Sequence, residues 1–139
     1  MGIVRDKVKK IIPVDMHLQK PTQDLDCKYD VITSSLCLEV AATTTEEHAT
    51  MVTKLADMLN PRGYLVLVGV LGQSYFRVGD YRFSGLQLSS EDIKRNITSA
   101  GFEISFWRES STGDNSPLCQ STEYSDFRGM FAVAAQKTV

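Results

Sequence analysis

The stretch MLNPRGYLVLVGVL, residues 58–71, combines the end of a helix, a tight turn and an uninterrupted apolar run. Pro61 cannot continue a helix, and Gly63 accepts the left-handed backbone of a turn. The eight residues that follow the turn are rich in valine and leucine and show no polar alternation. A run of this kind directly after a helix indicates a central strand of a parallel sheet, buried on both faces.

A predicted helix leads into this turn. Thr44 followed three residues later by Glu47 is a capping-box pattern. Apolar residues then recur with the 3.6-residue period of one buried stripe, at Val52, Leu55, Ala56 and Leu59. Residues 29–34, which come before this helix, are predicted to form a strand.

The remaining segments extend the same alternation. An amphipathic helix is expected over residues 3–12, where Pro13 ends it, and a second capped helix over residues 89–101. Strands are expected over residues 102–107 and 130–136, with loops at 72–88 and 113–117. Alternating strands and helices predict an α/β fold with a mostly parallel sheet and helices on both faces. Ligands of such sheets bind at the carboxyl ends of the strands, here near Asp15–Met16, Ser35–Glu39 and Gly69–Gly72.

Composition excludes several classes of protein. The chain has 139 residues, 42% of them hydrophobic, which suits one domain with a sizeable core. The formal net charge of −2 and the lack of aromatics among the few basic residues near the N-terminus argue against nucleic-acid binding. No apolar run reaches the length of a membrane span. Three cysteines without metal-ligand spacing, two isolated histidines and no signal peptide predict reduced thiols in a cytoplasmic protein without a metal site.

Glycine-rich nucleotide motifs are missing. The sequence contains neither GxGxxG nor GxxxxGK[ST], so an independent dinucleotide or nucleoside-triphosphate site has no phosphate cradle. An NAD-dependent oxidoreductase is therefore a remote alternative. A GxSxG nucleophile elbow is also absent, which leaves serine acyl transfer without support.

Four segments together resemble one small family. VDMHLQKP, YDVITSSLCLEVAA, LADMLNPRGYLVLVGVLGQSYFRVGDYRFSGLQL and EDIKRNITSAGFEISFW read in order like the carboxyl-terminal half of the nicotinamide, phenylethanolamine and indolethylamine N-methyltransferase group. The resemblance implies a partial, Rossmann-like class I methyltransferase fold with an antiparallel last strand. It also implies S-adenosylmethionine (SAM) as the cofactor and a small-molecule methyl acceptor as the substrate.

The resemblance further implies that residues 1–139 are the carboxyl-terminal part of a SAM-dependent methyltransferase domain that lacks the glycine-rich SAM loop. We expect a fragment or an incomplete gene model, inactive as the 139-residue chain alone. The alternative function is a non-catalytic half-domain that acts as an interaction module, with self-association through an exposed sheet edge.

Site residues are carried over one at a time. Asp15 matches the acid that binds the adenine amino group, and Met16 the residue whose backbone N–H meets the ring. Ser35 and Leu36 match strand-end residues that line the junction of SAM and substrate, while Cys37 is expected to be buried. No catalytic residue is assigned, because methyl transfer depends mainly on approach geometry and desolvation. The expected substrate-binding residues are Gly69, Val70, Gln73, Tyr75, Phe76 and Gly85.

One position departs from the family pattern. An acid that engages the acceptor nitrogen in the family matches Gly69, so an aromatic pocket without an acid is expected, with Tyr124 as a further aromatic side chain. Such a pocket favours a neutral acceptor over an ammonium. An aspartate at position 69 would then shift the preference toward amines, unless Asp80 or Glu39 already supplies the acid.

Overall fold

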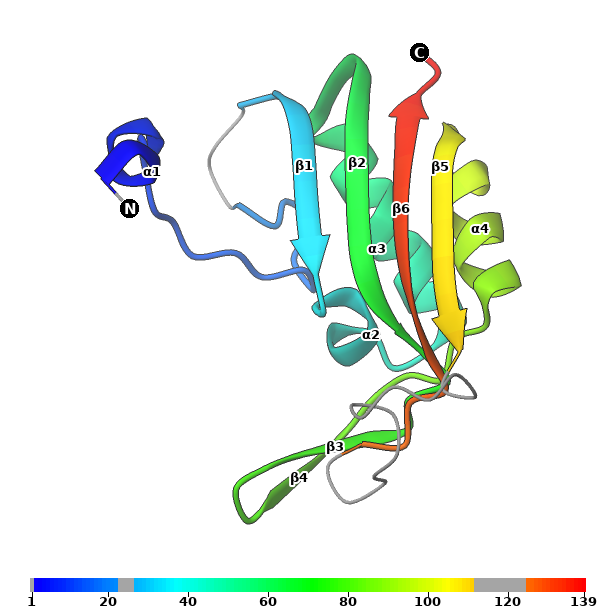
Figure 1. The fold of residues 1–139 in the computed structure, drawn as a ribbon. Coiled ribbons are helices and arrows are strands. Elements are labelled where there is room, and N and C mark those ends of the chain that lie inside the picture. Colours follow the sequence, from blue (N-terminus) through cyan, green and yellow to red (C-terminus); the bar gives the residue numbers. More distant parts are fainter. Residues whose placement is uncertain (1, 23–26, 112–124) are drawn as a thin grey trace.

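The computed structural model describes residues 2–22, 27–111 and 125–139, and its centre is a four-stranded sheet in the order β1-β2-β6-β5 (Figure 1). The strands are β1 (Tyr29–Ser35), β2 (Leu59–Leu71), β5 (Phe102–Ser111) and β6 (Gly129–Lys137). β1 and β2 are parallel, and β6 lies antiparallel between β2 and β5. Three strands therefore point the same way, which confirms the predicted α/β fold with an antiparallel last strand.

Two capped helices cover one face of the sheet. α3 (Thr45–Asp57) and α4 (Ser90–Ser99) both lie on the same side of the strands (Figure 1). Val52, Leu55 and Ala56 of the predicted stripe are buried on α3, whereas Leu59, also buried, begins β2. Ile93 and Ile97 of α4 are fully buried. They pack against the strand residues Leu65, Leu67, Phe131, Val133 and Ala135 in one core.

The opposite face of the sheet is only partly covered. Val66 and Val68 of β2 are half-buried, whereas Val31, Tyr64 and Phe106 are exposed. The expectation of helices on both faces is therefore not met within the part of the chain that the structure describes, because α3 and α4 share one face. In that part, no helix has the length and the apolar character required to cross a bilayer.

The turn before the central strand is built differently from the prediction. Arg62, with φ of 67°, adopts the left-handed conformation instead of Gly63. Gly63 is needed for close packing, since a Cβ there would lie 2.9 Å from the carbonyl oxygen of Asn60 and 3.0 Å from that of Asp30. β2 also begins before residue 64, because Leu59 already pairs with Tyr29 of β1.

Three smaller elements differ from expectation. α1 (Gly2–Lys7) is shorter than the predicted helix, and the chain after it runs without regular structure to residue 15. A short helix, α2 (Leu38–Ala41), follows β1. The segment expected to be a loop contains a hairpin of β3 (Tyr75–Val78) and β4 (Tyr81–Ser84), which extends beyond the carboxyl end of β2 (Figure 1). The predicted loop at 113–117 lies outside the described residues.

Candidate functional site

The end of β1 presents two predicted cofactor residues at the surface. Leu36 adopts a left-handed backbone with φ of 55°, and its N–H donates to the carbonyl of Val68 at 2.9 Å. This turn leaves Ser35 and Leu36 exposed at the carboxyl end of the parallel pair. Cys37 is also exposed, which differs from the expected burial because the same turn carries its side chain to the surface.

The segment with Asp15 and Met16 is anchored on α3. The Met16 side chain is buried, and its carbonyl accepts a hydrogen bond from Lys54 Nζ at 2.9 Å. The next residue, His17, places Nδ1 3.1 Å from Glu47 Oε1, and Glu47 in turn accepts from Thr43 at the start of α3. These contacts hold the segment near the helix start that follows the end of β1.

Two polar groups of this segment are open to a ligand. Asp15 Oδ1 accepts the His17 N–H at 2.9 Å, but its other oxygen has no donor among the described residues. The N–H of Met16 likewise has no acceptor in the described parts of the chain. An acceptor and a donor on adjacent residues fit the amino group and a ring nitrogen of an adenine edge. The four cofactor residues stay predictions, and the geometry is compatible with them.

The space above Gly69 is filled by an acid from another element. A Cβ at Gly69 would lie 2.9 Å from Glu39 Oε1, 3.1 Å from Glu39 Oε2 and 2.8 Å from Phe131 Cε1. Glu39 belongs to α2 and is 4% exposed. The pocket expected to lack an acid therefore holds one, because α2 turns Glu39 into the room that a side chain at position 69 would take.

Burial leaves the Glu39 carboxyl poorly solvated. Desolvation raises its pKa above the usual range, while the backbone N–H groups of Glu39 and Val70 act in the opposite direction. Its Oε1 atom accepts no hydrogen bond from any residue that the structure describes. An acceptor atom without a donor inside a protein is uncommon and identifies a point where a polar ligand or a water can bind.

Three further predicted substrate residues lie around the exit of β2. Val70 and Gln73 are buried, and Gln73 Nε2 donates to Ser125 Oγ at 2.8 Å. A Cβ at Gly85 would stand 3.1 Å from Gln73 Oε1, so glycine lets the returning chain approach this amide. The next residue, Leu86, donates its N–H to the Glu39 carbonyl at 2.8 Å. The structure thus brings Gly69, Val70, Gln73 and Gly85 together around Glu39.

The predicted aromatic residues lie on the hairpin. Phe76 stacks on Phe83 with ring centroids 5.2 Å apart, and the Arg82 guanidinium lies 4.0 Å from the centre of the Tyr75 ring. Both predicted rings are half-exposed. Tyr124 lies outside the described residues, so its expected role is not addressed by the structure. Asp80 is exposed near the hairpin turn and does not supply the acid of the pocket.

Asp126, which the sequence did not single out, fixes the base of the hairpin. Its carboxylate accepts the N–H groups of Ser74 at 2.8 Å and of Tyr75 at 3.2 Å, together with the Ser74 hydroxyl. Burial raises the pKa of Asp126, but the hydrogen bonds from Ser74 and Tyr75 outweigh it, so that the pKa is lowered overall. Asp126 therefore attaches β3 to the chain just before β6.

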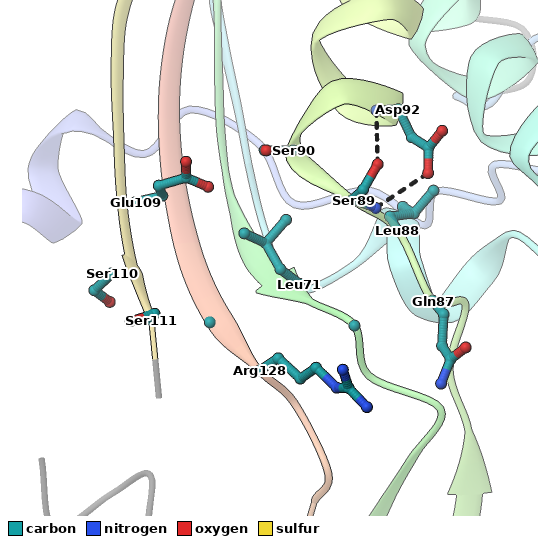
Figure 2. A pocket seen from close by; sticks show the side chains of 12 residues that line it. Leu71, Gln87, Leu88, Ser89, Ser90, Asp92, Glu109, Ser110, Ser111 and Arg128 are labelled. Atoms are coloured by element: carbon teal, nitrogen blue, oxygen red, sulfur yellow. Dashed lines mark hydrogen bonds between the residues drawn. The ribbon is translucent and has the colours of Figure 1, made fainter. Parts of the chain in front are cut away.

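A wide cavity at the start of α4 is a separate feature. It has a volume of about 780 Å³ and lies between the start of α4 and the end of β5 (Figure 2). None of the predicted site residues lines it. Ser89 and Asp92, which do, already bond each other's backbone in the capping box of α4 (Figure 2). Because none of the predicted site residues lies here, and Glu39 has a buried oxygen without a donor among the described residues, we place the candidate site around Glu39.

Two curated enzymes are similar to the chain over nearly its whole length. Phenylethanolamine N-methyltransferase of Mus musculus is 29% identical over 137 residues, which are 96% of this chain and 45% of the enzyme. Nicotinamide N-methyltransferase of Homo sapiens is 26% identical over 135 residues, 96% of this chain and 49% of the enzyme. The chain thus spans about half the length of these relatives.

Solved structures show the same fold. A SAM-dependent methyltransferase from Methanosarcina mazei superimposes with a TM-score of 0.61 at 16% identity, covering 84% of this chain and 64% of that one. The N-methyltransferase NodS from Bradyrhizobium japonicum, solved with S-adenosyl-L-homocysteine, gives 0.52 at 13% identity, with 84% and 50% coverage. At these identities the likeness concerns the fold, which is that of SAM-dependent methyltransferases.

A sequence profile then decides the family. It matches residues 3–138, almost the entire chain, and it describes the group that the four sequence segments resembled. The chain belongs to the NNMT/PNMT/TEMT family.

Proposed function

We propose that the protein takes part in SAM-dependent N-methylation of a small molecule in the cytoplasm. The observation that carries the proposal is the buried Glu39 carboxyl over Gly69, with one oxygen unpartnered, at the strand ends where the family resemblance puts the acceptor. The family and the fold support the reaction class. The exposed thiols of Cys27 and Cys37, neither of them in a disulfide, agree with a reducing compartment.

The site residues form two groups, one that would bind the cofactor and one that would bind the acceptor. Asp15 and Met16 would hold the adenine edge, while Ser35 and Leu36 would line the junction with the acceptor. When bound, the cofactor supplies an electrophilic methyl group on sulfur. Glu39 would then orient the acceptor nitrogen, and the hairpin aromatics would keep water from the reacting atoms.

This geometry changes the expected acceptor. A neutral molecule was predicted because Gly69 carries no charge, but the Glu39 carboxyl occupies that place. An acceptor nitrogen that bears a hydrogen, in an amine or an amide, would satisfy the free oxygen of Glu39. We therefore propose an acceptor that carries an N–H group, whether charged or neutral, in place of one selected only for its lack of charge.

The test joins the first half of human nicotinamide N-methyltransferase, which this chain does not cover, to residues 3–139. With labelled SAM and a panel of amines and amides, the chimera should methylate an N–H-bearing acceptor. Glu39→Gln should lower kcat/KM about 10- to 100-fold, the cost of losing a hydrogen bond to a charged group. Glu46→Gln, on the exposed face of α3, is the matched control. Transfer that is indifferent to Glu39→Gln would contradict the assigned role.

The 139-residue chain should bind SAM weakly, with a dissociation constant of roughly 1 mM or higher. The sequence provides the adenine edge but no glycine-rich loop for the ribose and methionine, which carry most of the polar recognition. Isothermal titration calorimetry measures this directly, with the chimera as the positive control. Micromolar binding by the chain would mean that residues other than the predicted four hold the cofactor.

A specific observation favours a second function, that of an interaction module. β1 is an edge strand of the sheet, with no partner on its outer side among the described residues, and Val31 on it is 55% exposed. Unpaired backbone groups with exposed apolar side chains favour pairing with another strand, including that of a second copy. Sedimentation measures whether the chain self-associates, with Val31→Lys as the control. Self-association through β1 requires that this variant associate more weakly than the wild type.

A further inference from the structure

Glu39 lines a small cavity. Its volume is about 10 Å³, and Leu38, Leu67, Val68 and Phe131 form its apolar walls. Its polar lining comes from three elements, with Ser34 on β1, Glu39 on α2 and His48 on α3. A space of this size admits one water molecule, and such a water requires two to four polar partners.

The unpartnered oxygen of Glu39 is one of these partners. The backbone N–H groups of Glu39 and Val70 interact with the carboxyl, whereas Oε1 has no donor in the described residues. Leaving a buried carboxylate oxygen without a hydrogen bond costs more free energy than a typical hydrogen bond contributes. The cavity is the space from which a donor can reach it.

Asn96 of α4 forms a hydrogen bond with one ring nitrogen of His48. Asn96 Nδ2 lies 3.0 Å from His48 Nδ1 and 3.3 Å from the carbonyl oxygen of Thr45. The carbonyl can only accept, so the amide must present N–H groups on this side, and Nδ1 must be an acceptor. Neutral His48 therefore carries its proton on Nε2, which is free to act as a donor, and His48 is one of the residues that line the cavity.

We propose that one buried water in this cavity joins the Nε2–H of His48 to Oε1 of Glu39. The chain of donors runs from Asn96 to His48, from His48 to the water, and from the water to the carboxylate. Ser34 supplies the water's third partner. His48 is thus a positioning residue that favours the ionised form of Glu39. Oε1 accepts the water with one lone pair and keeps a second for an N–H-bearing acceptor.

The charges around His48 agree with this arrangement. Burial lowers the pKa of His48 to about 4, and only Asp92 on α4 acts against it. His48 is therefore neutral at pH 7, as a one-proton donor to the water requires. Toward Glu39, β2 contributes the Val70 N–H, and among the described residues no other charged side chain is seen to influence the carboxyl.

We call this chain of hydrogen bonds, from Asn96 through His48 and the water to Glu39, the relay. Its importance for methyl transfer rests on the proposed function, but its existence does not. The tests therefore need no cofactor and no activity. In the 139-residue chain, long-range ¹⁵N–¹H spectra should show His48 as the Nε2–H tautomer at pH 7. A crystal structure should show a water between His48 and Glu39. The Nδ1–H tautomer, or an empty cavity at high resolution, would overturn the proposal without affecting the assigned function.

The pKa of Glu39 in variants of His48 gives a second test, because a His48 side chain that only filled space would not supply a hydrogen bond to the carboxylate. In a ¹³C-carboxyl titration, His48→Phe should raise the pKa of Glu39 by about one pH unit, because the carboxylate loses its water-borne hydrogen bond. His48→Gln, whose amide places a donor near the position of Nε2, should restore most of the difference. His17→Phe, at the exposed histidine, is the control and should leave Glu39 unchanged. Equal pKa values in the wild type and His48→Phe would exclude the relay.

Discussion

Replacing Gly69 by aspartate should lower the free energy of unfolding by about 3 kcal/mol. The new Cβ would stand 2.8 Å from Phe131 and 2.9 Å from Glu39. The Phe131 ring cannot easily move, because it stacks on Trp107 with centroids 5.4 Å apart. The added carboxylate would also meet that of Glu39 in a buried space, where like charges cannot both ionise without cost. From the sequence alone, this change was expected to improve amine binding.

Urea unfolding of a short series separates the two causes. Gly69→Ala carries the steric conflict without the charge and should be destabilising by a smaller amount. Glu39→Gln combined with Gly69→Asp removes the repulsion and should recover part of the loss, whereas Glu39→Gln alone should be nearly neutral. A Gly69→Asp protein as stable as the wild type would mean that α2 moves away from β2 at little cost.

Elements encoded by local pattern could be predicted from the sequence. The cap of α3 is present, since Thr44 accepts the Glu47 N–H at 3.0 Å, although the Glu47 carboxylate bonds Thr43 instead of closing a capping box. The stronger box occurs at α4, where Ser89 and Asp92 satisfy each other's N–H groups. These contacts join residues three or four positions apart, so the sequence specifies them without knowledge of the fold.

The hairpin could also have been predicted. Residues 75–78 and 81–84 are rich in aromatic and apolar side chains and flank a two-residue Gly79–Asp80 turn, in which Gly79 adopts a φ of +61°. An apolar or aromatic residue on each side of a glycine-aspartate pair is a recognised hairpin signal. The prediction of a loop is therefore wrong for residues 75–84, which form β3, its turn and β4.

The acid of the candidate site depends on long-range geometry that no local pattern contains. Glu39 reaches Gly69 only because β1 pairs in parallel with β2, which sets the end of β1 and the turn at Leu36 beside Val68. Asp126 and Ser74 are 52 residues apart in the sequence, and they are in contact because β6, which follows Asp126, lies between β2 and β5. The sequence could identify the position that lacks an acid and two acids that could replace it, Asp80 and Glu39, but only the fold decides that Glu39 does so.

Acid should destabilise the protein through His48. The folded-state pKa of about 4 lies below the ordinary value of 6.5, so between these values the unfolded chain binds the extra proton. Stability from neutral His48 is therefore complete above pH 6.5 and is lost as the pH falls toward 4, by about 3 kcal/mol in total. Desolvation causes the shift, since His48 is 2% exposed.

The effect of His48 on stability should be measured in a variant in which residue 39 does not titrate. Burial raises the pKa of Glu39, so its protonation in the folded state opposes the effect of His48 in the same acid range. Glu39→Gln removes that contribution. In this background, urea unfolding at intervals from pH 7.5 to 4 should show a steep fall with His48 and a much shallower one with His48→Phe. Parallel pH profiles would mean that the protonated imidazole finds a partner in the folded protein, and Asp92 is the residue that would have to approach it.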